Sequence, residues 1–325
     1  MKVLVTGAAG FVGYYSSLRL LANGHQIVGI DNLNEYYDVR LKYARLSELE
    51  KNANFKFQKL DLADRSGMAT LFQEQSFDVV LHLGAQAGVR YSIDNPFAYL
   101  DSNLTGMLTV LEGCRHHGVK HLVYASSSSV YGANTKLPFA LEDRVDTPIS
   151  LYAATKKADE LMAYTYAHLY KFPITGLRFF TVYGPLGRPD MAYFKFADAI
   201  RAGRPIDVYN HGDMKRDFTY IDDIVNGIEA IVNQPPAALA DTVPHRVYNL
   251  GHNHPESLMD MISILEDKLG KKAEKRFLPM QPGDVYATYA DISAIQHDYG
   301  FKPQTSLAEG LDKFASWYVA YYTKV

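Results

Sequence analysis

Cysteine is nearly missing from this chain of 325 residues, which contains only Cys114. One cysteine cannot form a disulfide within the chain, so a disulfide-stapled fold is excluded and a reducing compartment is the expected location. The sequence also lacks an apolar run of about 20 residues, the length that crosses a membrane. No charged and then apolar leader precedes the first apolar stretch. We therefore expect a cytoplasmic protein with no membrane partner.

An excess of charge of one sign is missing as well. Lys and Arg number 33 and Asp and Glu number 36, giving a formal charge of -3. This near balance offers no electrostatic attraction to nucleic acid. Internal repeats and low-complexity tracts are absent too. His252 and His254 have no cysteine nearby in the sequence, so we predict no metal site.

Short apolar runs alternate with helix-like stretches through the first half of the chain. Strands are predicted at residues 2–5, 26–30, 55–59, 79–83, 121–125 and 174–179. This alternation predicts an α/β fold with a doubly wound parallel sheet of the Rossmann type, covered on both faces. In such sheets ligands bind at the carboxyl ends of the strands. The pattern loosens after Thr181, which predicts a smaller C-terminal α/β domain.

A glycine-rich turn follows the first predicted strand, with Gly7, Gly10 and Gly13 spaced as G-x-x-G-x-x-G. Glycines let backbone N–H groups approach a pyrophosphate at the positive end of a helix. Asp31 ends the second predicted strand, where a dinucleotide fold needs an acid for the adenosine ribose. Because an acid there repels a 2′-phosphate, the pattern favours NAD over NADP.

Tyr152 and Lys156 are four residues apart in a predicted helix, so their side chains face one target. A fixed ammonium nearby favours the phenolate form of a tyrosine. Such a pair is suited to removing a proton from a sugar hydroxyl. The Y-x-x-x-K spacing also arises by chance on helix faces, so the surrounding motifs must support it.

Taken together, these motifs resemble the extended short-chain dehydrogenase/reductase superfamily, and within it the NAD-dependent nucleotide-sugar epimerases. The resemblance covers essentially the whole chain. It is carried by residues 6–13, Asp31-Asn32, Asp61-Leu62, residues 82–85, 126–132, 152–156 and 178–185. It implies an isomerase that binds NAD and a nucleotide sugar. Helices near residues 96–115 and 151–170 pair between subunits in this superfamily, so a homodimer is also implied; the alternative is that the apolar faces of these helices are internal core.

The resemblance assigns the cofactor contacts residue by residue. It implies that the pyrophosphate is held by Gly7, Gly10, Phe11, Val12 and Gly13. The adenosine half would be bound by Asp31, Asn32, Asn34, Asp61 and Leu62, and the path to the nicotinamide ribose would be lined by Leu83, Gly84, Ala85, Gln86, Tyr152 and Lys156.

The serine run distinguishes between reactions of the superfamily. By resemblance, Ser127 would contact the sugar 4-hydroxyl, with Tyr152 as acid/base. Related dehydratases carry an Asp-Glu pair where this chain has Ser128 and Ser129. Hydroxyls cannot shuttle protons as carboxylates do, so elimination is disfavoured. The remaining reaction is hydride transfer to tightly bound NAD and back, through a transient 4-keto intermediate.

Residues 32–42, 85–92 and 183–192 resemble the UDP-glucuronate 4-epimerase branch, whose substrates are UDP-glucuronate and UDP-galacturonate. Hydroxyls of Ser128, Ser129 and Thr181 would form a cradle for the sugar carboxylate. The remaining implied substrate contacts are Arg90, Arg188 and Arg216 at the diphosphate and Asp284 at the uridine ribose. Gln281 departs from the galactose branch, which usually has a second phosphate-binding arginine there.

The resemblance also divides the chain. It predicts an NAD-binding domain over residues 1–180, with 219–250 returning to it, and a substrate domain over residues 181–218 and 251–325. Two alternatives stay open. One is a UDP-glucuronate decarboxylase, or another UDP-sugar 4-epimerase of the glucose/galactose type, on the same scaffold. The other is a non-catalytic, NAD-sensing binding protein, against which Ser127, Tyr152 and Lys156 argue.

Overall fold

The computed structural model describes residues 1–236, 242–281 and 285–323. The chain folds as two compact units. The first comprises Met1–Asn134, Leu141–Phe179 and Val225–Asn249, and the second comprises Thr135–Ala140, Phe180–Ile224 and Leu250–Val325. The assignment of cofactor and substrate to separate domains remains a prediction.

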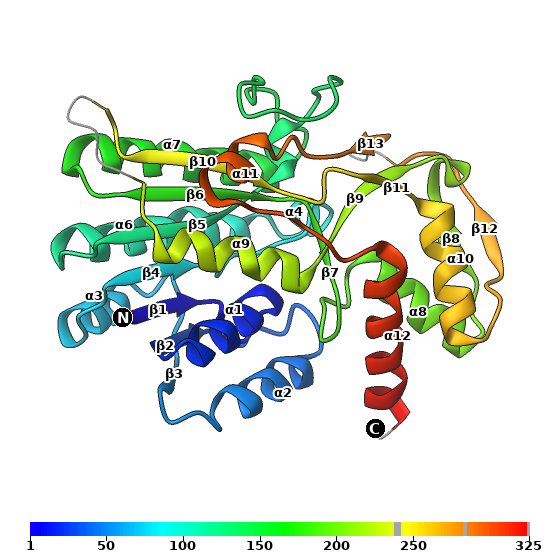
Figure 1. The fold of residues 1–325 in the computed structure, drawn as a ribbon, viewed down its shortest axis with the longest axis horizontal. Coiled ribbons are helices and arrows are strands. Elements are labelled where there is room, and N and C mark those ends of the chain that lie inside the picture. Colours follow the sequence, from blue (N-terminus) through cyan, green and yellow to red (C-terminus); the bar gives the residue numbers. More distant parts are fainter. Residues whose placement is uncertain (237–241, 282–284, 324–325) are drawn as a thin grey trace. The chain divides into compact units, whose positions relative to one another are not determined.

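The first unit is built on a seven-stranded sheet with the order β10-β6-β5-β4-β1-β2-β3 (Figure 1). Its strands are β1 (Lys2–Thr6), β2 (Gln26–Asp31), β3 (Phe55–Lys59), β4 (Val79–His82), β5 (His121–Ser127), β6 (Ile174–Phe179) and β10 (His245–Leu250). From β3 across to β6 neighbouring strands run parallel. The predicted doubly wound parallel sheet is therefore confirmed.

Helices connect these strands and cover both faces of the sheet (Figure 1). They are α1 (Phe11–Ala22), α2 (Val39–Leu49), α3 (Arg65–Glu74), α4 (Tyr91–Asp94), α5 (Pro96–Tyr99), η1 (Leu100–Thr105), α6 (Gly106–His116), η2 (Ser128–Tyr131), α7 (Leu151–Tyr170) and α9 (Ile221–Asn233). Helix α6 packs against both α3 and α7, and α1 packs against α2. The helical stretch expected near residues 96–115 is divided, because η1 between α5 and α6 is a π-helical segment.

One part of the core of this unit lies between the sheet and α3, α6 and α7. Leu4 and Val80 of the sheet join Phe72, Leu111 and Ala163 of those helices in one buried cluster. These side chains recur at helical spacing on α3, α6 and α7, and burying them excludes water from both surfaces. The strands are therefore fixed in the middle of the unit, with their carboxyl ends free to carry polar residues.

The second unit contains smaller sheets. Strand β9 (Lys215–Tyr220) pairs with β7, β11 and β13, and β8 pairs with β12. The other elements are β7 (Thr181–Tyr183), α8 (Ala192–Ala202), β8 (Ile206–Val208), η3 (Tyr209–Gly212), β11 (Pro255–Ser257), α10 (Leu258–Leu269), β12 (Lys275–Phe277), β13 (Ala287–Thr288), α11 (Ser293–Tyr299) and α12 (Leu307–Thr323).

Local sequence explains where several helices begin and end. Side chains of Asp38, Asp64 and Ser257 accept hydrogen bonds from backbone N–H groups at the starts of α2, α3 and α10. Gly203 and Gly270 end α8 and α10 in the left-handed conformation, at φ +69° and +65°. Within the described residues, no helix has the length and apolar character needed to span a membrane.

Candidate functional site

The glycine turn between β1 and α1 leaves no room for side chains. Gly7 has φ +68°, and a Cβ on it would lie 2.8 Å from the backbone of Gly84. A Cβ on Gly13 would lie 2.1 Å from the Gly7 carbonyl oxygen. Gly10 precedes α1, and no side chain caps that end of the helix. The first turn of α1, which holds Phe11 and Val12, therefore offers backbone N–H groups and a positive dipole end, which fit a pyrophosphate.

Asp31 lies at the carboxyl end of β2, one strand away from the glycine turn. Its Oδ1 accepts a hydrogen bond of 2.8 Å from the Leu33 backbone N–H. The Lys42 ammonium, from α2, lies 3.5 Å from the same oxygen, and both side chains are buried. The sequence predicts only the negative charge of Asp31. The buried Lys42 ammonium offsets part of that charge, and this ion pair is visible only in the folded structure.

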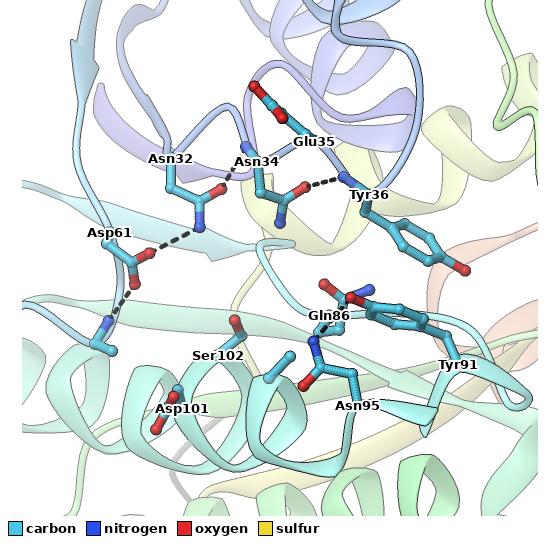
Figure 2. A pocket seen from close by; sticks show the side chains of 12 residues that line it. Asn32, Asn34, Glu35, Tyr36, Asp61, Gln86, Tyr91, Asn95, Asp101 and Ser102 are labelled. Carbon is cyan, nitrogen blue, oxygen red and sulfur yellow. Dashed lines mark hydrogen bonds between the residues drawn. The ribbon is translucent and has the colours of Figure 1, made fainter. Parts of the chain in front are cut away.

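A cavity of about 470 Å³ opens at the carboxyl ends of β2, β3 and β4 (Figure 2). Four of its lining residues were predicted from the sequence, namely Asn32, Asn34, Asp61 and Gln86, and the others are Glu35, Tyr36, Ala63, Tyr91, Asn95, Ala98, Asp101 and Ser102. Asn32 Nδ2 donates a 2.8 Å hydrogen bond to Asp61 Oδ2. These polar groups match the hydroxyls and ring nitrogens of a nucleoside.

Two aromatic rings from different loops meet at this cavity. The rings of Tyr36 and Tyr91 have centroids 4.7 Å apart. Asn95 Nδ2 donates a hydrogen bond of 2.8 Å to the Tyr91 hydroxyl, which fixes that ring (Figure 2). The segment after β2 and the segment after β4 are therefore in direct contact over the cavity-lining residues. The sequence placed Tyr36 and Tyr91 in suggestive motifs but gave them no role.

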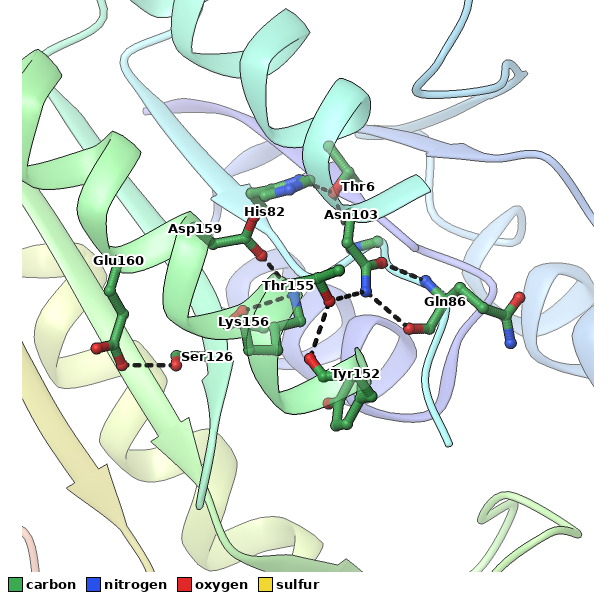
Figure 3. A network of polar contacts seen from close by, with 12 residues as sticks. Thr6, His82, Gln86, Asn103, Ser126, Tyr152, Thr155, Lys156, Asp159 and Glu160 are labelled. Carbon is green, nitrogen blue, oxygen red and sulfur yellow. Dashed lines mark hydrogen bonds and ion pairs between the residues drawn. The ribbon is translucent and has the colours of Figure 1, made fainter. Parts of the chain in front are cut away.

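Tyr152 and Lys156 both lie near the start of α7 (Figure 3). The helix begins at this point because Ser150 accepts a hydrogen bond from the Ala153 N–H at 3.1 Å. Tyr152 is half-buried, and its ring lies edge-on to Tyr99 at 6.0 Å. The Lys156 side chain is almost fully buried, and its ammonium donates to the Ala125 carbonyl at 3.0 Å. The fold thus holds this lysine firmly at the end of β5.

Asn103, which sequence reasoning missed, connects Tyr152 with the loop after β4. Its amide accepts a 2.8 Å hydrogen bond from the Gln86 N–H and donates to the Gln86 carbonyl at 3.1 Å. It also donates to the Thr155 hydroxyl at 3.0 Å, and that hydroxyl donates to the Tyr152 carbonyl (Figure 3). The π-helical segment η1 carries Asn103 into this position. The only sequence signal was an amide side chain in an otherwise helix-like stretch.

The serine run at the end of β5 divides into two roles. Ser126 donates to Glu160 at 2.8 Å, and Glu160 is paired with the buried Arg178 at 2.8 Å. Ser127 instead caps η2, accepting from the Ser129 N–H and donating to the Ser129 hydroxyl, each at 3.1 Å. Successive side chains of a strand point to opposite faces, which explains this division. Ser128 and Ser129 are partly exposed.

Burial controls the charge state of His82 and Asp159 around Lys156. Burial, and then the Lys156 charge, lowers the pKa of His82 to about 3, so its imidazole is neutral at pH 7. Its Nδ1 lies 2.8 Å from the Thr6 hydroxyl. Burial also raises the pKa of Asp159 to about 6, although Lys156 acts in the opposite direction. At neutral pH the charges in this part of the site are therefore the Lys156 ammonium and the Asp159 carboxylate, while His82 is neutral.

The other predicted substrate residues are distributed over both units. Arg90 is exposed at the start of α4 in the first unit. In the second unit, Thr181 opens β7, Arg188 forms an ion pair with Asp190, and Arg216 donates to the Lys215 carbonyl at 2.8 Å. Asp284 lies outside the described residues. Their roles remain predictions.

Comparisons with known proteins show which family the chain belongs to. A sequence model of the NAD dependent epimerase/dehydratase family matches residues 3–251. The chain is 47% identical to a probable UDP-glucuronate 4-epimerase of Rhizobium meliloti, covering 100% of the chain and 98% of that protein. It is 48% identical to UDP-glucuronate 4-epimerase 1 of Arabidopsis thaliana, over 99% of the chain and 77% of the plant protein.

A solved structure gives the same result for the fold. It is the UDP-glucuronic acid 4-epimerase of Bacillus cereus in complex with UDP-glucuronic acid and NAD. The two proteins are 35% identical, and the match covers 99% of this chain and 100% of the other with a TM-score of 0.91.

Proposed function

The chain belongs to the NAD-dependent epimerase/dehydratase family, and we propose that it is an isomerase that interconverts UDP-glucuronate and UDP-galacturonate by inverting sugar carbon 4. The observation that carries this proposal is the likeness, along essentially the whole chain, to proteins named UDP-glucuronate 4-epimerase. The substrate of the reaction is therefore a UDP-sugar whose ring bears a carboxylate.

NAD is the cofactor of this family, and the first unit fits it. The glycines let the turn pack tightly against backbone at the start of α1, where free N–H groups suit a pyrophosphate, and the polar cavity nearby has space for a nucleoside. When bound, NAD supplies the chemistry of accepting a hydride from sugar carbon 4 and returning it. We assign its adenosine half to Asp31, Asn32, Asn34, Asp61 and Leu62, and its nicotinamide half to residues 83–86 and Lys156.

We propose that Tyr152 holds and moves the proton of the sugar 4-hydroxyl. The Lys156 ammonium, fixed by the Ala125 carbonyl at 3.0 Å, supplies a positive charge one helical turn after that tyrosine on α7. Ser127 orients the same hydroxyl. The phenol formed when Tyr152 takes the proton returns it once the sugar has presented its other face. The same residue thus acts as base and then as acid.

The remaining assignments rest on the resemblance to the family. Ser128, Ser129 and Thr181 bind the sugar carboxylate through hydroxyls. The substrate diphosphate is assigned to Arg90, Arg188 and Arg216, and the uridine ribose to Asp284. Hydroxyl groups suit a sugar that must bind in two orientations, because they have no fixed counter-charge.

A product assay tests the proposed function. The purified protein is denatured to identify released NAD, and native protein is incubated with UDP-glucuronate. We expect UDP-galacturonate and no net change in NAD. UDP-xylose as the product would instead identify a decarboxylase, and turnover of UDP-glucose alone would identify an epimerase of the glucose/galactose type. Binding of NAD without any turnover would indicate a sensing protein.

A Tyr152→Phe variant tests the proton transfer. We expect kcat to fall roughly 100- to 10,000-fold, the usual contribution of a general acid/base, while UDP-glucuronate still binds. Steady-state kinetics and calorimetric binding measure the two effects. Tyr164→Phe, at an exposed tyrosine of the same helix, is the matched control. Full turnover by Tyr152→Phe would remove Tyr152 as the base.

We further propose that the protein is a cytoplasmic homodimer. The cytoplasm is the simplest compartment for a chain with one cysteine, and Cys114 is buried as a free thiol. The dimer is supported by exposed apolar side chains on α7, including Leu161 at 57% and Leu169 at 59%. Apolar groups exposed along one helix are typical of an interaction surface.

A further inference from the structure

Asp159 is a buried carboxylate one helical turn after Lys156, and the sequence gave it no role. Its Oδ2 lies 3.0 Å from the Lys156 ammonium, and the two side chains are 1% and 3% exposed. Its Oδ1 has no hydrogen-bond partner among the residues that the structure describes. A buried charge costs free energy unless it is paired, and an unpartnered buried oxygen adds to that cost. The free-energy cost of burying the Asp159 carboxylate therefore calls for a functional explanation.

The surrounding groups leave Asp159 as the anion paired directly with Lys156. Glu160, the next residue of α7, is bound to Arg178 of β6. Burial raises the pKa of Glu160, but the hydrogen bonds from Arg178 and Ser126 and the charges of Arg178 and Lys157 together outweigh burial and leave that pKa below its ordinary value. From β4, the buried His82 is neutral at pH 7.

Tyrosine hydroxyls complete the titratable surroundings. Burial, and then the charges of Glu160 and Asp159, raises the pKa of Tyr124 of β5, so this phenol carries no charge. From α5, Tyr99 contacts the ring of Tyr152 edge-on and donates its own hydrogen bond to the Ala87 carbonyl at 3.0 Å. Of the groups named, the Lys156 ammonium therefore has one charged partner in contact, the Asp159 carboxylate.

We propose that Asp159 is a positioning residue for the reaction: its carboxylate holds the Lys156 ammonium in place and reduces the positive potential that this ammonium exerts on Tyr152. The inference rests on the proposed function, in which Tyr152 is the base. Asp159 contacts neither substrate nor cofactor in this scheme. It acts through Lys156. The other hydrogen bond of the Lys156 ammonium goes to the backbone carbonyl of Ala125, which is a neutral group.

Because the Asp159 carboxylate can be protonated, its effect on the Lys156 charge depends on pH. Burial raises its pKa to about 6, so the carboxylate is ionised above pH 6 and takes up a proton below it. At neutral pH the anion therefore partly cancels the ammonium. Removing the anion leaves the full ammonium charge acting on Tyr152, which favours the phenolate.

The test is the pH dependence of kcat in the Asp159→Asn variant of the NAD-loaded enzyme. We expect the acidic limb of kcat to move down by about one pH unit, the effect of a unit charge about 10 Å away, two helical turns along α7, at an effective dielectric of about 20. KM for UDP-glucuronate should stay unchanged. Asp159→Ala, which removes the charge without adding an amide, should shift the limb in the same direction and keeps the test valid if the asparagine variant misfolds.

A second measurement does not depend on turnover. Tyrosine labelled with ¹³C at Cζ reports its own ionisation by NMR, and the Tyr152 signal is identified by its loss in Tyr152→Phe. Its titration midpoint should move down in both Asp159 variants. Glu112→Gln, which removes a half-exposed carboxylate paired with Arg115 on α6, is the matched control and should leave the midpoint in place.

The outcomes separate this inference from the proposed function. An acidic limb and a Tyr152 midpoint that stay in place, or move up, in both variants would overturn the role of Asp159. Wild-type protein that fails to convert UDP-glucuronate would overturn the function, while the Tyr152 midpoint would still decide whether Asp159 tunes Lys156.

Discussion

Neighbouring side chains in this site have different roles because each meets different partners. Ser126 and Ser127 are adjacent, yet Ser126 supports the buried Arg178–Glu160 pair and Ser127 faces the short helix that follows β5. A residue name and its place in a motif are not sufficient to assign chemistry. The direction of the side chain decides which of two serines can reach a substrate.

A Thr181→Ala variant tests the hydroxyl cradle. Oxidation at carbon 4 turns the uronate into a β-keto acid, which loses CO₂ unless its carboxylate is restrained. We therefore expect Thr181→Ala to release some pentose nucleotide or to lose turnover of UDP-glucuronate, as measured by chromatography of the products. Thr165→Ala, at an exposed threonine of α7, serves as the control. Unchanged turnover and product purity would exclude Thr181 from the cradle.

Helices and loops fix the positions of the site residues relative to one another. Ser150 caps the start of α7, so Tyr152 and Lys156 lie in the first two turns of that helix. The π-helical segment η1 turns Asn103 toward both α7 and the loop after β4. The two loops that meet through Tyr36 and Tyr91 lie over residues assigned to the adenosine half of NAD.

The contact between these loops predicts how long NAD stays bound. Gly88, at φ +107°, lies so close to Tyr36 that a Cβ would be 2.5 Å from its hydroxyl. Removing the ring in Tyr36→Ala should speed the loss of NAD by roughly 2- to 12-fold, because an aromatic pair contributes roughly 0.5–1.5 kcal/mol. NAD retained after repeated desalting is the measurement. The exposed Tyr43 provides a Tyr43→Ala control, and equal retention in wild type and Tyr36→Ala would contradict the prediction.

At the scale of the whole molecule, one unit carries the proposed cofactor site and the base, and the other carries Thr181, Arg188 and Arg216. The outward surface of α7 remains apolar, with Leu161, Tyr164 and Leu169 all more than half exposed. This helix carries Tyr152, the proposed base, on its first turn. A second copy of the chain packed on α7 would therefore stabilise the site it supports.

A Leu161→Arg variant tests the dimer. We expect wild type to sediment as a dimer of the 36.5 kDa chain and the variant to shift toward monomer, because a buried arginine in an apolar interface is costly. Analytical ultracentrifugation over a range of concentrations measures this shift. Val319→Arg changes an exposed apolar residue on α12 and should leave the mass unchanged. A monomeric wild type would disprove the predicted dimer.

The sequence by itself determined the features that depend on short spacings along the chain. The alternation of strands and helices predicted the parallel sheet, and Gly7, Gly10 and Gly13 predicted a tight turn before a helix. The four-residue spacing of Tyr152 and Lys156 predicted that both lie on one helix. Such patterns are readable because periods of helices and strands are local properties of the backbone.

Only the tertiary structure decided which distant groups meet the site. Asn103 reaches Thr155 across 52 residues, and Lys42 reaches Asp31 because α2 folds back onto β2. Even Asp159, three residues from Lys156, became significant only once both were found to be buried together. Burial and long-range pairing fix the charges of a site, and both arise from packing, which no local spacing encodes.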